Sequence, residues 1–446
     1  MRVGSVMTIL KQIITILREE FKKLPDKRGK KHLTYTIEDI ATAAFSVFYF
    51  QSKSWLDFQR NMFSKTGKSN AKSLFDIDHI PSDNHIRDIL DDIGVEKLQG
   101  VFDKIYHWLL KKETFKEYEY FNNTLLVLLD GTHYHSSQKI HCSHCQTKIK
   151  TNTKGEEYTE YYHSAITPII AHPKQSKIFS LFPEVIANKD GDTKQDCEIN
   201  ASKRWLDRTH LIAQDYTLVL LGDDLYCKTS FIRKAIEKQH HYIFVCKESS
   251  HKKMYETINY IEKLGEVDTK AVTRRNKSQK KESYSYKYLN TVNLTGDKDS
   301  LSVNWCSVEV KDEKDKVIYS GAFATDYTID EHNVEKIVEA GRTRWKIENE
   351  NNNVLKTGGY NLDHNFGHGK KGLSELLFTL NILSFLTHTI CLKHDKGYKE
   401  LYELINNRKT FFGHITTFTT FFYISDWNTL WNTMIDGYIN GLHLDS

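Results

Sequence analysis

The spacing of hydrophobic and polar positions changes partway along the chain. In the first part, apolar residues recur at three- and four-residue intervals, as they do on one face of a helix. One such stretch is Ile37–Phe50, and another is IPSDNHIRDIL at 80–90, in which Ser82 or Asp83 is suited to cap the helix N-terminus. We therefore predict an N-terminal helical domain over residues 1–115, and its pattern fits a DNA-binding domain and a docking domain equally well.

Short, wholly apolar runs replace the helical spacing between residues 116 and 250. The runs NTLLVLLDGT and YTLVLLGDDLY have the composition of strands that are buried on both faces. Asp130 follows the first run directly, and Asp223 and Asp224 follow the second. Two further runs, YYHSAITPIIAH and KIFSLFPEVIA, predict an antiparallel pair. The predicted order is three strands, helix, strand, helix, strand and helix.

An alternating pattern rich in Tyr and Val interrupts this order at residues 251–328. The runs SYSYKYLNTVNL, SLSVNWCSVEV and KVIYSGAFATD are separated by the turn-forming GDKD and KDEKDK, so they predict a β-rich insertion of hairpins. Residues 116–250 and 329–396 then form one core, and 397–446 form a C-terminal helical segment. The predicted fold class is α/β: a ribonuclease H-like mixed sheet flanked by helices, with an N-terminal helical domain and the insertion.

An acidic residue shares the apolar face of the helix predicted from 330 to 356. At about 3.6 residues per turn, this face carries Val334, Ile337, Val338, Gly341, Trp345 and Glu348. Burial of an unpartnered carboxylate is costly, so we expect Glu348 to meet a cation, a proton or a metal. Our hypothesis is that Glu348 joins Asp130 and Asp223 in one metal site.

The chemistry of this site follows from its three acids. Carboxylates that converge from separate elements can hold two divalent cations about 4 Å apart, which activate an attacking oxygen and stabilise the leaving oxygen of a phosphodiester. Mg²⁺ suits such hard oxygen ligands, with Mn²⁺ as the alternative. We expect Asp130 and Asp223 to bridge or flank the metals and Glu348 to complete the second site. Each acid alone fits a solvated surface position, and the joint placement favours the metal site.

Composition sets bounds on this picture. Lys and Arg total 62 against 58 acids, and the net charge of +4 is too small to indicate nucleic-acid binding by itself. Basic residues do cluster at 22–32, 273–282 and 341–346, where solvated surface is the alternative explanation. Seven scattered Cys without a secretory signal indicate a reduced, cytoplasmic setting. About twenty uninterrupted apolar residues would be needed to span a membrane, and the sequence has no such run, so we predict a soluble protein.

The sequence HCSHC at 141–145 has the spacing of a zinc half-site in Cys142 and Cys145. Further ligands would come from His133, His135 or His163, and a reduced surface loop is the alternative. His364 and His368, in YNLDHNFGHG, either lie near the active site or stabilise a Gly-rich turn. A structural Zn²⁺ is therefore an open question. Glu198 lies near the start of a predicted helix, where interaction with the helix dipole explains an acid.

Several motifs extend along most of the chain: LPDKRGKKHLTY, IPSDNHIRD, LLDGTHYHSS with HCSHC, QDCEINA, GDDLY and RTRWKIENENNNVLKTGGYNLDHNFGHG. Together they resemble the DDE transposases of bacterial insertion sequences, in the group with a β insertion before the catalytic Glu. By this resemblance Asp130, Asp223 and Glu348 match the catalytic triad. Asp223 is preferred to Asp224 because the family acid follows a Gly directly, here Gly222.

The resemblance implies a transposase that binds terminal inverted repeats, cleaves DNA by metal-dependent hydrolysis and joins the 3′ ends to target DNA. Double-stranded DNA would be its partner, it would form a homodimer on DNA, and it would act in the bacterial cytoplasm, at the nucleoid when DNA-bound. One alternative is a transposase-derived DNA-binding protein that does not cleave. Another is a ribonuclease H-like metal nuclease with a different substrate.

Basic residues around Glu348 depart in part from the family signature. Arg344 has the expected position for a DNA phosphate contact, but Gly341 stands where the signature has a Tyr. Lys356 lies one residue beyond the signature Lys, whose position Leu355 occupies. Arg342, beside Arg344, and Arg274 and Arg275, in the insertion, are further predicted DNA contacts.

Overall fold

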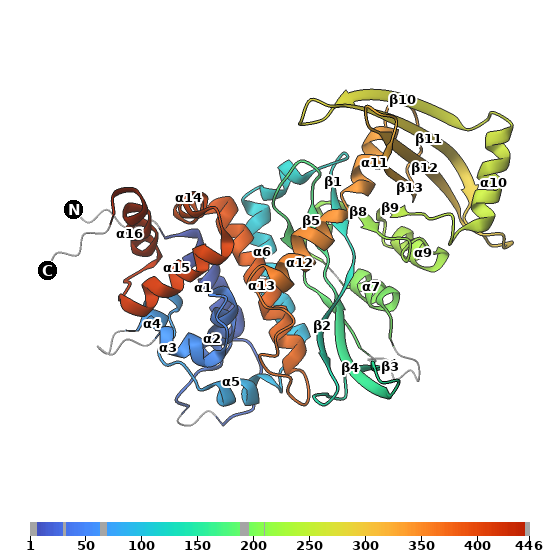
Figure 1. The fold of residues 1–446 in the computed structure, drawn as a ribbon. Coiled ribbons are helices and arrows are strands. Elements are labelled where there is room, and N and C mark those ends of the chain that lie inside the picture. The colour runs from blue at the N-terminus through green and yellow to red at the C-terminus, as the bar shows by residue number, and fades with distance from the viewer. Residues whose placement is uncertain (1–6, 30–32, 63–68, 188–195, 209, 442–446) are drawn as a thin grey trace.

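The computed structural model describes residues 7–29, 33–62, 69–187, 196–208 and 210–441 (Figure 1). The last three residues of the basic cluster at 22–32 lie outside these ranges.

A nine-stranded mixed sheet forms the centre of the molecule, in the order β10-β11-β12-β13-β9-β8-β1-β5-β6. Its core part consists of β1 (Thr124–Leu128), β5 (Ile169–Ala171), β6 (Phe179–Ser180), β8 (Thr217–Gly222) and β9 (His241–Val245). Strands β1, β8 and β9 are parallel, whereas β5 runs antiparallel to β1 and β6 antiparallel to β5. This is the ribonuclease H-like arrangement, so the predicted fold class is confirmed.

Helices cover the sheet on both sides, which is why β1 and β8 are apolar after their first Thr (Figure 1). On one side lie α7 (Glu198–Asp207) and α9 (Thr229–Glu237), and on the other lies α13 (Leu373–His394). Helix α13 is long and apolar enough to cross a membrane, but its apolar window is entirely buried within the protein. It is therefore packed as a core helix here.

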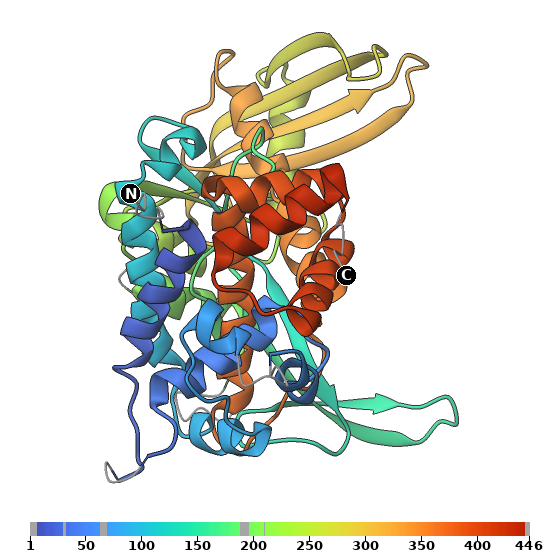
Figure 2. The same cartoon turned by 90° about the vertical axis from the view of Figure 1, so that its left-hand side faces the viewer.

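The N-terminal and C-terminal helices form one layer against α13 (Figures 1 and 2). The N-terminal helices are α1 (Ile9–Phe21), α2 (Ile37–Tyr49), α3 (Trp55–Met62), α4 (Asn70–Phe75), α5 (Asp83–Leu90) and α6 (Gln99–Lys111). The C-terminal helices are α14 (Lys396–Ile405), α15 (Arg408–Phe421) and α16 (Trp427–Asn440). Ser82 caps α5, since its hydroxyl accepts a hydrogen bond from the His85 amide.

The β-rich insertion extends the core sheet. Its strands are β10 (Asp268–Arg275), β11 (Lys281–Asn293), β12 (Ser302–Lys311) and β13 (Val317–Thr325), and each pairs antiparallel with the next. Strand β13 then pairs with β9, so the hydrogen bonding continues into the core. The last three strands match the three predicted runs. Strand β10 and helix α10 (Lys252–Lys263) were not predicted.

A second, smaller sheet contains β2 (Gly131–Ser137), β3 (Gln146–Thr151), β4 (Glu157–Ile166) and β7 (Glu184–Ile186). The predicted antiparallel pair is present but divided between the two sheets, because β4 pairs with β7 and β5 with β6. The break falls at Thr167-Pro168, where Pro168 has no amide proton for a sheet. The hairpin of β3 and β4 projects from the body of the molecule (Figure 2).

Candidate active site

Asp130 and Asp223 meet at one edge of the main sheet. Asp130 follows β1, Asp223 follows β8, and the two strands run parallel with Leu128 opposite Leu221. The carboxyl ends of parallel strands lie at the same edge, so the strand pairing itself brings the two acids together. This is the arrangement that the two apolar runs in the sequence predicted.

The electrostatic surroundings of Asp130 connect it to the other acids. The pKa of Asp130 is raised to about 7, first by burial and then by the nearby carboxylates Glu198, Glu348 and Asp223, while Arg344 opposes the rise. Like charges disfavour ionisation, so the three predicted acids interact electrostatically at Asp130, and we refer to them as the acidic cluster. Carboxylate oxygens are ligands that divalent cations prefer.

Asn352 holds Asp130 in place. The side-chain amide of Asn352 donates to Asp130 Oδ2 at 2.8 Å, and the Thr167 hydroxyl donates to Asn352 Oδ1 at 2.9 Å. The Thr167 amide also donates to the Asp130 carbonyl at 3.0 Å. Asn352 comes from the same irregular helix as Glu348, so this contact joins the first acid to the segment of the third. No local pattern in the sequence predicts this role of Asn352.

The two neighbouring acids Asp223 and Asp224 have different partners. Asp223 Oδ1 accepts from the Leu225 amide at 2.9 Å, and the charge of Asp223 acts on both Asp130 and Glu198. Asp224 Oδ1 instead accepts from the Lys247 amide at 2.6 Å and lies 3.4 Å from His251 Nε2. Asp224 therefore interacts with the segment after β9, which supports the choice of Asp223 for the site.

Glu198 is a fourth acid at this site. It lies in the first turn of α7, as predicted, and its Oε1 accepts from the Tyr226 hydroxyl at 2.8 Å. Burial raises the pKa of Glu198, and so does the charge of Asp223. A Cβ on Gly131 would lie 2.4 Å from Glu198 Oε2, so this approach requires glycine. The sequence signal for Glu198 is the QDCEINA motif, in which the helix dipole was a sufficient explanation for the acid.

The predicted continuous helix around Glu348 is wrong beyond Gly341. Helix α11 (Val334–Arg342) ends at Arg342, and a π-helix follows at Ile347–Asn352 before α12 (Asn353–Thr357). The side chain of Glu348 is 50% exposed and Trp345 is 47% exposed, so neither continues the apolar face. The wider turns of the π-helix bury Ile347 and Asn352 instead. Glu348 thus belongs to the acidic cluster although it is solvent-accessible. The cost of burying a carboxylate, from which its role was predicted, does not apply here.

The predicted basic residues do not lie in one group. Arg344 donates to Glu348 Oε1 at 2.5 Å, and Lys356 lies 4.0 Å from Asp363. Arg274 and Arg342 line a groove of about 650 Å³ between α11 and the insertion, together with Lys174, Tyr284, Tyr286, Lys336 and Trp345. Within this groove Arg274 pairs with Glu335, and Arg342 lies 4.2 Å from the Tyr319 ring centre.

Arg275 does not share this arrangement. Its guanidinium donates to the Gln279 carbonyl at 2.9 Å in the turn between β10 and β11. It is exposed at the end of the insertion.

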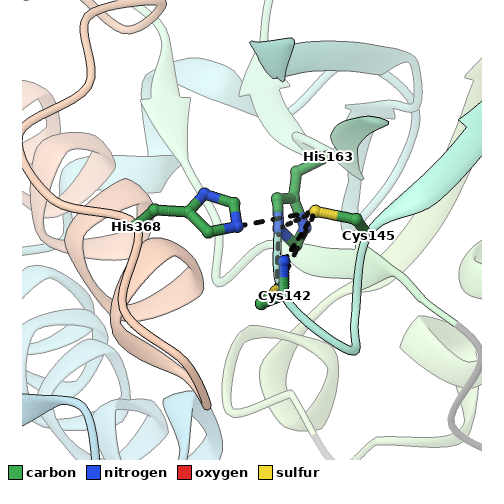
Figure 3. Close-up of side chains that lie close together, drawn as sticks. All are labelled: Cys142, Cys145, His163 and His368. Carbon is green, nitrogen blue, oxygen red and sulfur yellow. Dashed lines mark hydrogen bonds between the residues drawn. The ribbon is translucent and has the colours of Figure 1, made fainter. Parts of the chain in front are cut away.

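Cys142 and Cys145 lie with two histidines in a compact group (Figure 3). His163 is one of the three ligands that the sequence offered, and His368 completes the group. His135 is not part of it, because its Nε2 donates to the Ile140 carbonyl at 3.2 Å. His133 is exposed and packs edge-on against Tyr162.

Comparison with protein families gives a direct match. Residues 185–386 match the model of the transposase DDE domain. This part of the chain is a transposase DDE domain. The resemblance to DDE transposases of insertion sequences is thereby confirmed. The match contains Asp223 and Glu348, and Asp130 precedes it. DDE transposases act on DNA and use divalent metal ions. The chain has no match among curated proteins.

The raised pKa of Asp130 gives a prediction for the protein in the absence of divalent metal ions. The folded state holds the Asp130 proton up to a pH of about 7, while the unfolded chain loses it near 3.8. The folded state therefore becomes less stable as the pH rises from 3.8 to about 7, and this loss of stability is complete above pH 7. We expect Asp130→Asn to raise the melting temperature at pH 8 by about 1–3 °C, and by less at pH 5.

Thermal unfolding in Mg²⁺-free buffer at several pH values measures this difference. Asp299→Asn, at an exposed position, is the control and should leave the melting temperature unchanged at both pH 5 and pH 8. A gain from Asp130→Asn that is the same at both pH values would contradict the prediction.

Proposed function

We propose that the protein is the transposase of an insertion sequence, which cleaves DNA at the element's terminal inverted repeats and joins the 3′ ends to target DNA. The observation that supports this most is the convergence of Asp130, Asp223 and Glu348, from β1, β8 and the π-helix, on one electrostatic cluster within a protein that carries a transposase DDE domain. The three acids are the proposed catalytic residues, and Mg²⁺, or Mn²⁺ in its place, is the proposed cofactor.

Each acid has a role in holding the metals. Asp130, fixed by Asn352, and Asp223 would bind from the sheet edge, and Glu348 would close the site from the solvent side. When bound, divalent cations supply activation of the attacking oxygen and stabilisation of the leaving oxygen. Cleavage uses water as the nucleophile and joining uses a 3′ hydroxyl, so the same acids can serve both steps because only the attacking oxygen changes.

Arg344 links this site to DNA. In the described structure its guanidinium is paired with Glu348 at 2.5 Å. If Glu348 held a divalent cation, its charge would be shared with that ion, and Arg344 would be available to a DNA phosphate beside the scissile bond. Lys356, on the next helix, is the proposed second contact.

The groove between α11 and the insertion is the proposed path for DNA next to the acids. Arg274, Arg342, Lys174 and Lys336 supply positive charge there, and the exposed ring of Trp345 can stack on a base. Arg275, at the end of the insertion, is a proposed contact farther along the DNA. Binding that rests on several such phosphate contacts should weaken strongly as salt increases. Synapsis of two DNA ends makes a homodimer the proposed active form, acting in the cytoplasm.

Cleavage and joining of DNA that carries the sequences flanking the gene test this function. The purified protein is incubated with labelled duplex in Mg²⁺, Mn²⁺ or Ca²⁺. We expect breaks at the element ends that leave 3′ hydroxyls, and joined products with target DNA, in Mg²⁺ and Mn²⁺. Binding without breaks in either metal would favour a non-cleaving DNA-binding protein. Equal cleavage of DNA that lacks the ends would favour a nuclease with another substrate.

A further inference from the structure

Four metal-binding side chains from distant parts of the chain converge outside the acidic cluster. Cys142 and Cys145 lie in the turn between β2 and β3, His163 lies in β4, and His368 lies in the segment between α12 and α13 (Figure 3). Their ligand atoms all lie within 4.8 Å of one another. His163 and His368 are buried, and the two Cys are half-buried. Two thiols and two imidazoles are a ligand set that Zn²⁺ prefers.

The distances agree with a tetrahedral site. With Zn–S near 2.3 Å and Zn–N near 2.0 Å, a tetrahedron places two sulfurs about 3.8 Å apart and a sulfur and a nitrogen about 3.5 Å apart. The two sulfurs are 4.0 Å apart here, and His163 Nε2 lies 3.4 Å from Cys142 Sγ and 3.3 Å from Cys145 Sγ. His368 Nε2 lies 3.5 Å from Cys145 Sγ. A disulfide, by contrast, needs sulfurs about 2.05 Å apart.

We propose that Cys142, Cys145, His163 and His368 bind one structural Zn²⁺. Four protein ligands fill a tetrahedral shell and leave no position for water or substrate, which is the mark of a structural zinc. The neighbouring histidines are engaged elsewhere, since His135 donates to Ile140 and His144 Nδ1 lies 2.9 Å from Glu375 Oε1.

The zinc joins the chain segments that carry two of the acids. His163 lies opposite His135 in the pairing of β4 with β2, and β2 starts directly after Asp130. His368 belongs to the segment that follows the helices of Glu348. One metal ion therefore ties the strand beyond Asp130 to the segment beyond Glu348.

The segment around His368 depends on such ties because it has little regular structure. Gly367 and Gly369 have φ values of +151° and +69°, which other residues rarely adopt. The Asp91 carboxylate accepts hydrogen bonds from the amides of Lys370, Lys371 and Leu373 on one side of His368. On the other side, residues 358–366 lead back to α12. The zinc would fix the middle of this segment.

Metal analysis of the full chain, purified with a tag that lacks histidine, tests the site. We expect Cys142→Ser and Cys145→Ser to lose about one zinc per chain relative to the unaltered protein. Cys197→Ser, at an exposed Cys outside the group, is the matched control and should lose none. A second group, Cys227, Cys246 and His251, also offers three ligand atoms and could bind zinc. The test is therefore the difference in zinc content between variants and not the total zinc content. Equal zinc in Cys142→Ser and Cys197→Ser would overturn the proposal.

Cobalt substitution gives a second, spectroscopic readout. Co²⁺ in the unaltered protein and in Cys197→Ser should give the visible spectrum of a tetrahedral site with two thiolates, and Cys142→Ser should weaken it. Absence of this spectrum would count against the ligand set.

Hydrogen exchange tests whether the zinc cross-links the turn at 138–146 to the segment around His368. Removal of zinc should speed amide exchange in residues 358–372 and in the turn at 138–146 by about tenfold or more, and leave β8 unchanged. Unchanged exchange in both segments would refute the cross-link. None of these measurements uses DNA, so their outcome is independent of the proposed activity.

Discussion

Replacement of Glu348 by Gln should reduce Mg²⁺-dependent DNA cleavage by about a thousandfold or more and leave DNA binding within about threefold. The substitution keeps the size of the side chain but removes the negative charge that would hold a cation. It also removes the charge that pairs with Arg344 at 2.5 Å in the structure. Asp130→Asn and Asp223→Asn should have effects of the same order, since the three acids share one cluster.

Glu350 provides the matched control. It lies in the same π-helix, but its carboxylate lies 3.5 Å from Lys346 Nζ, whereas Glu348 is among the groups that raise the pKa of Asp130. Glu350→Gln should leave cleavage within about threefold of the unaltered protein. Cleavage and binding are measured on the same labelled duplex. If Glu348→Gln cleaves as fast as Glu350→Gln, Glu348 is not a catalytic residue.

Restoring the family's Tyr at position 341 should destabilise the protein by about 3 kcal/mol or more. Gly341 is buried in α11, and a Cβ there would lie 2.5 Å from the ring of Phe323 in β13. Even Ala would require a shift of that ring, and Tyr would separate the helix from the sheet. Glycine at this position is therefore a packing requirement of this chain, and the signature Tyr cannot be accommodated without changes around it.

Unfolding in urea measures this effect, with Gly413→Tyr as the control. Gly413 also lies within a helix, but a Cβ there has no atom within 4 Å. Its replacement should change the free energy of unfolding by less than about 1 kcal/mol. Equal stability of the two variants would show that α11 can move away from Phe323 at little cost.

The fold could be predicted because its elements have strong local patterns. Apolar runs marked β1 and β8, and alternating Tyr and Val marked β11, β12 and β13. The same local patterns placed Asp130 and Asp223 at strand ends. Parallel pairing of β1 with β8 then brings the two acids to the same edge of the sheet. Which strands pair with each other was harder to predict from the sequence. The region 160–187, for example, was predicted as one antiparallel pair but is divided between two sheets.

The site was less predictable where a residue's role depends on distant contacts. Helical periodicity assumes a regular α-helix, so it could not anticipate the π-helix that exposes Glu348 and buries Asn352. Glu198 had an adequate local explanation, and only the tertiary contact with Gly131 places it beside the other acids. His368 lies more than two hundred residues from the two Cys, which is why spacing alone could not assign it to their group.

The pairing of β13 with β9 has a mechanical consequence. Each strand is hydrogen-bonded to the next from β10, at the outer edge of the insertion, to β8, which Asp223 follows. A sheet of this kind resists bending between neighbouring strands much more than two domains joined by a linker would. The insertion and the core should thus behave as one stiff body. DNA that lies across both would therefore have to bend in order to reach the acids.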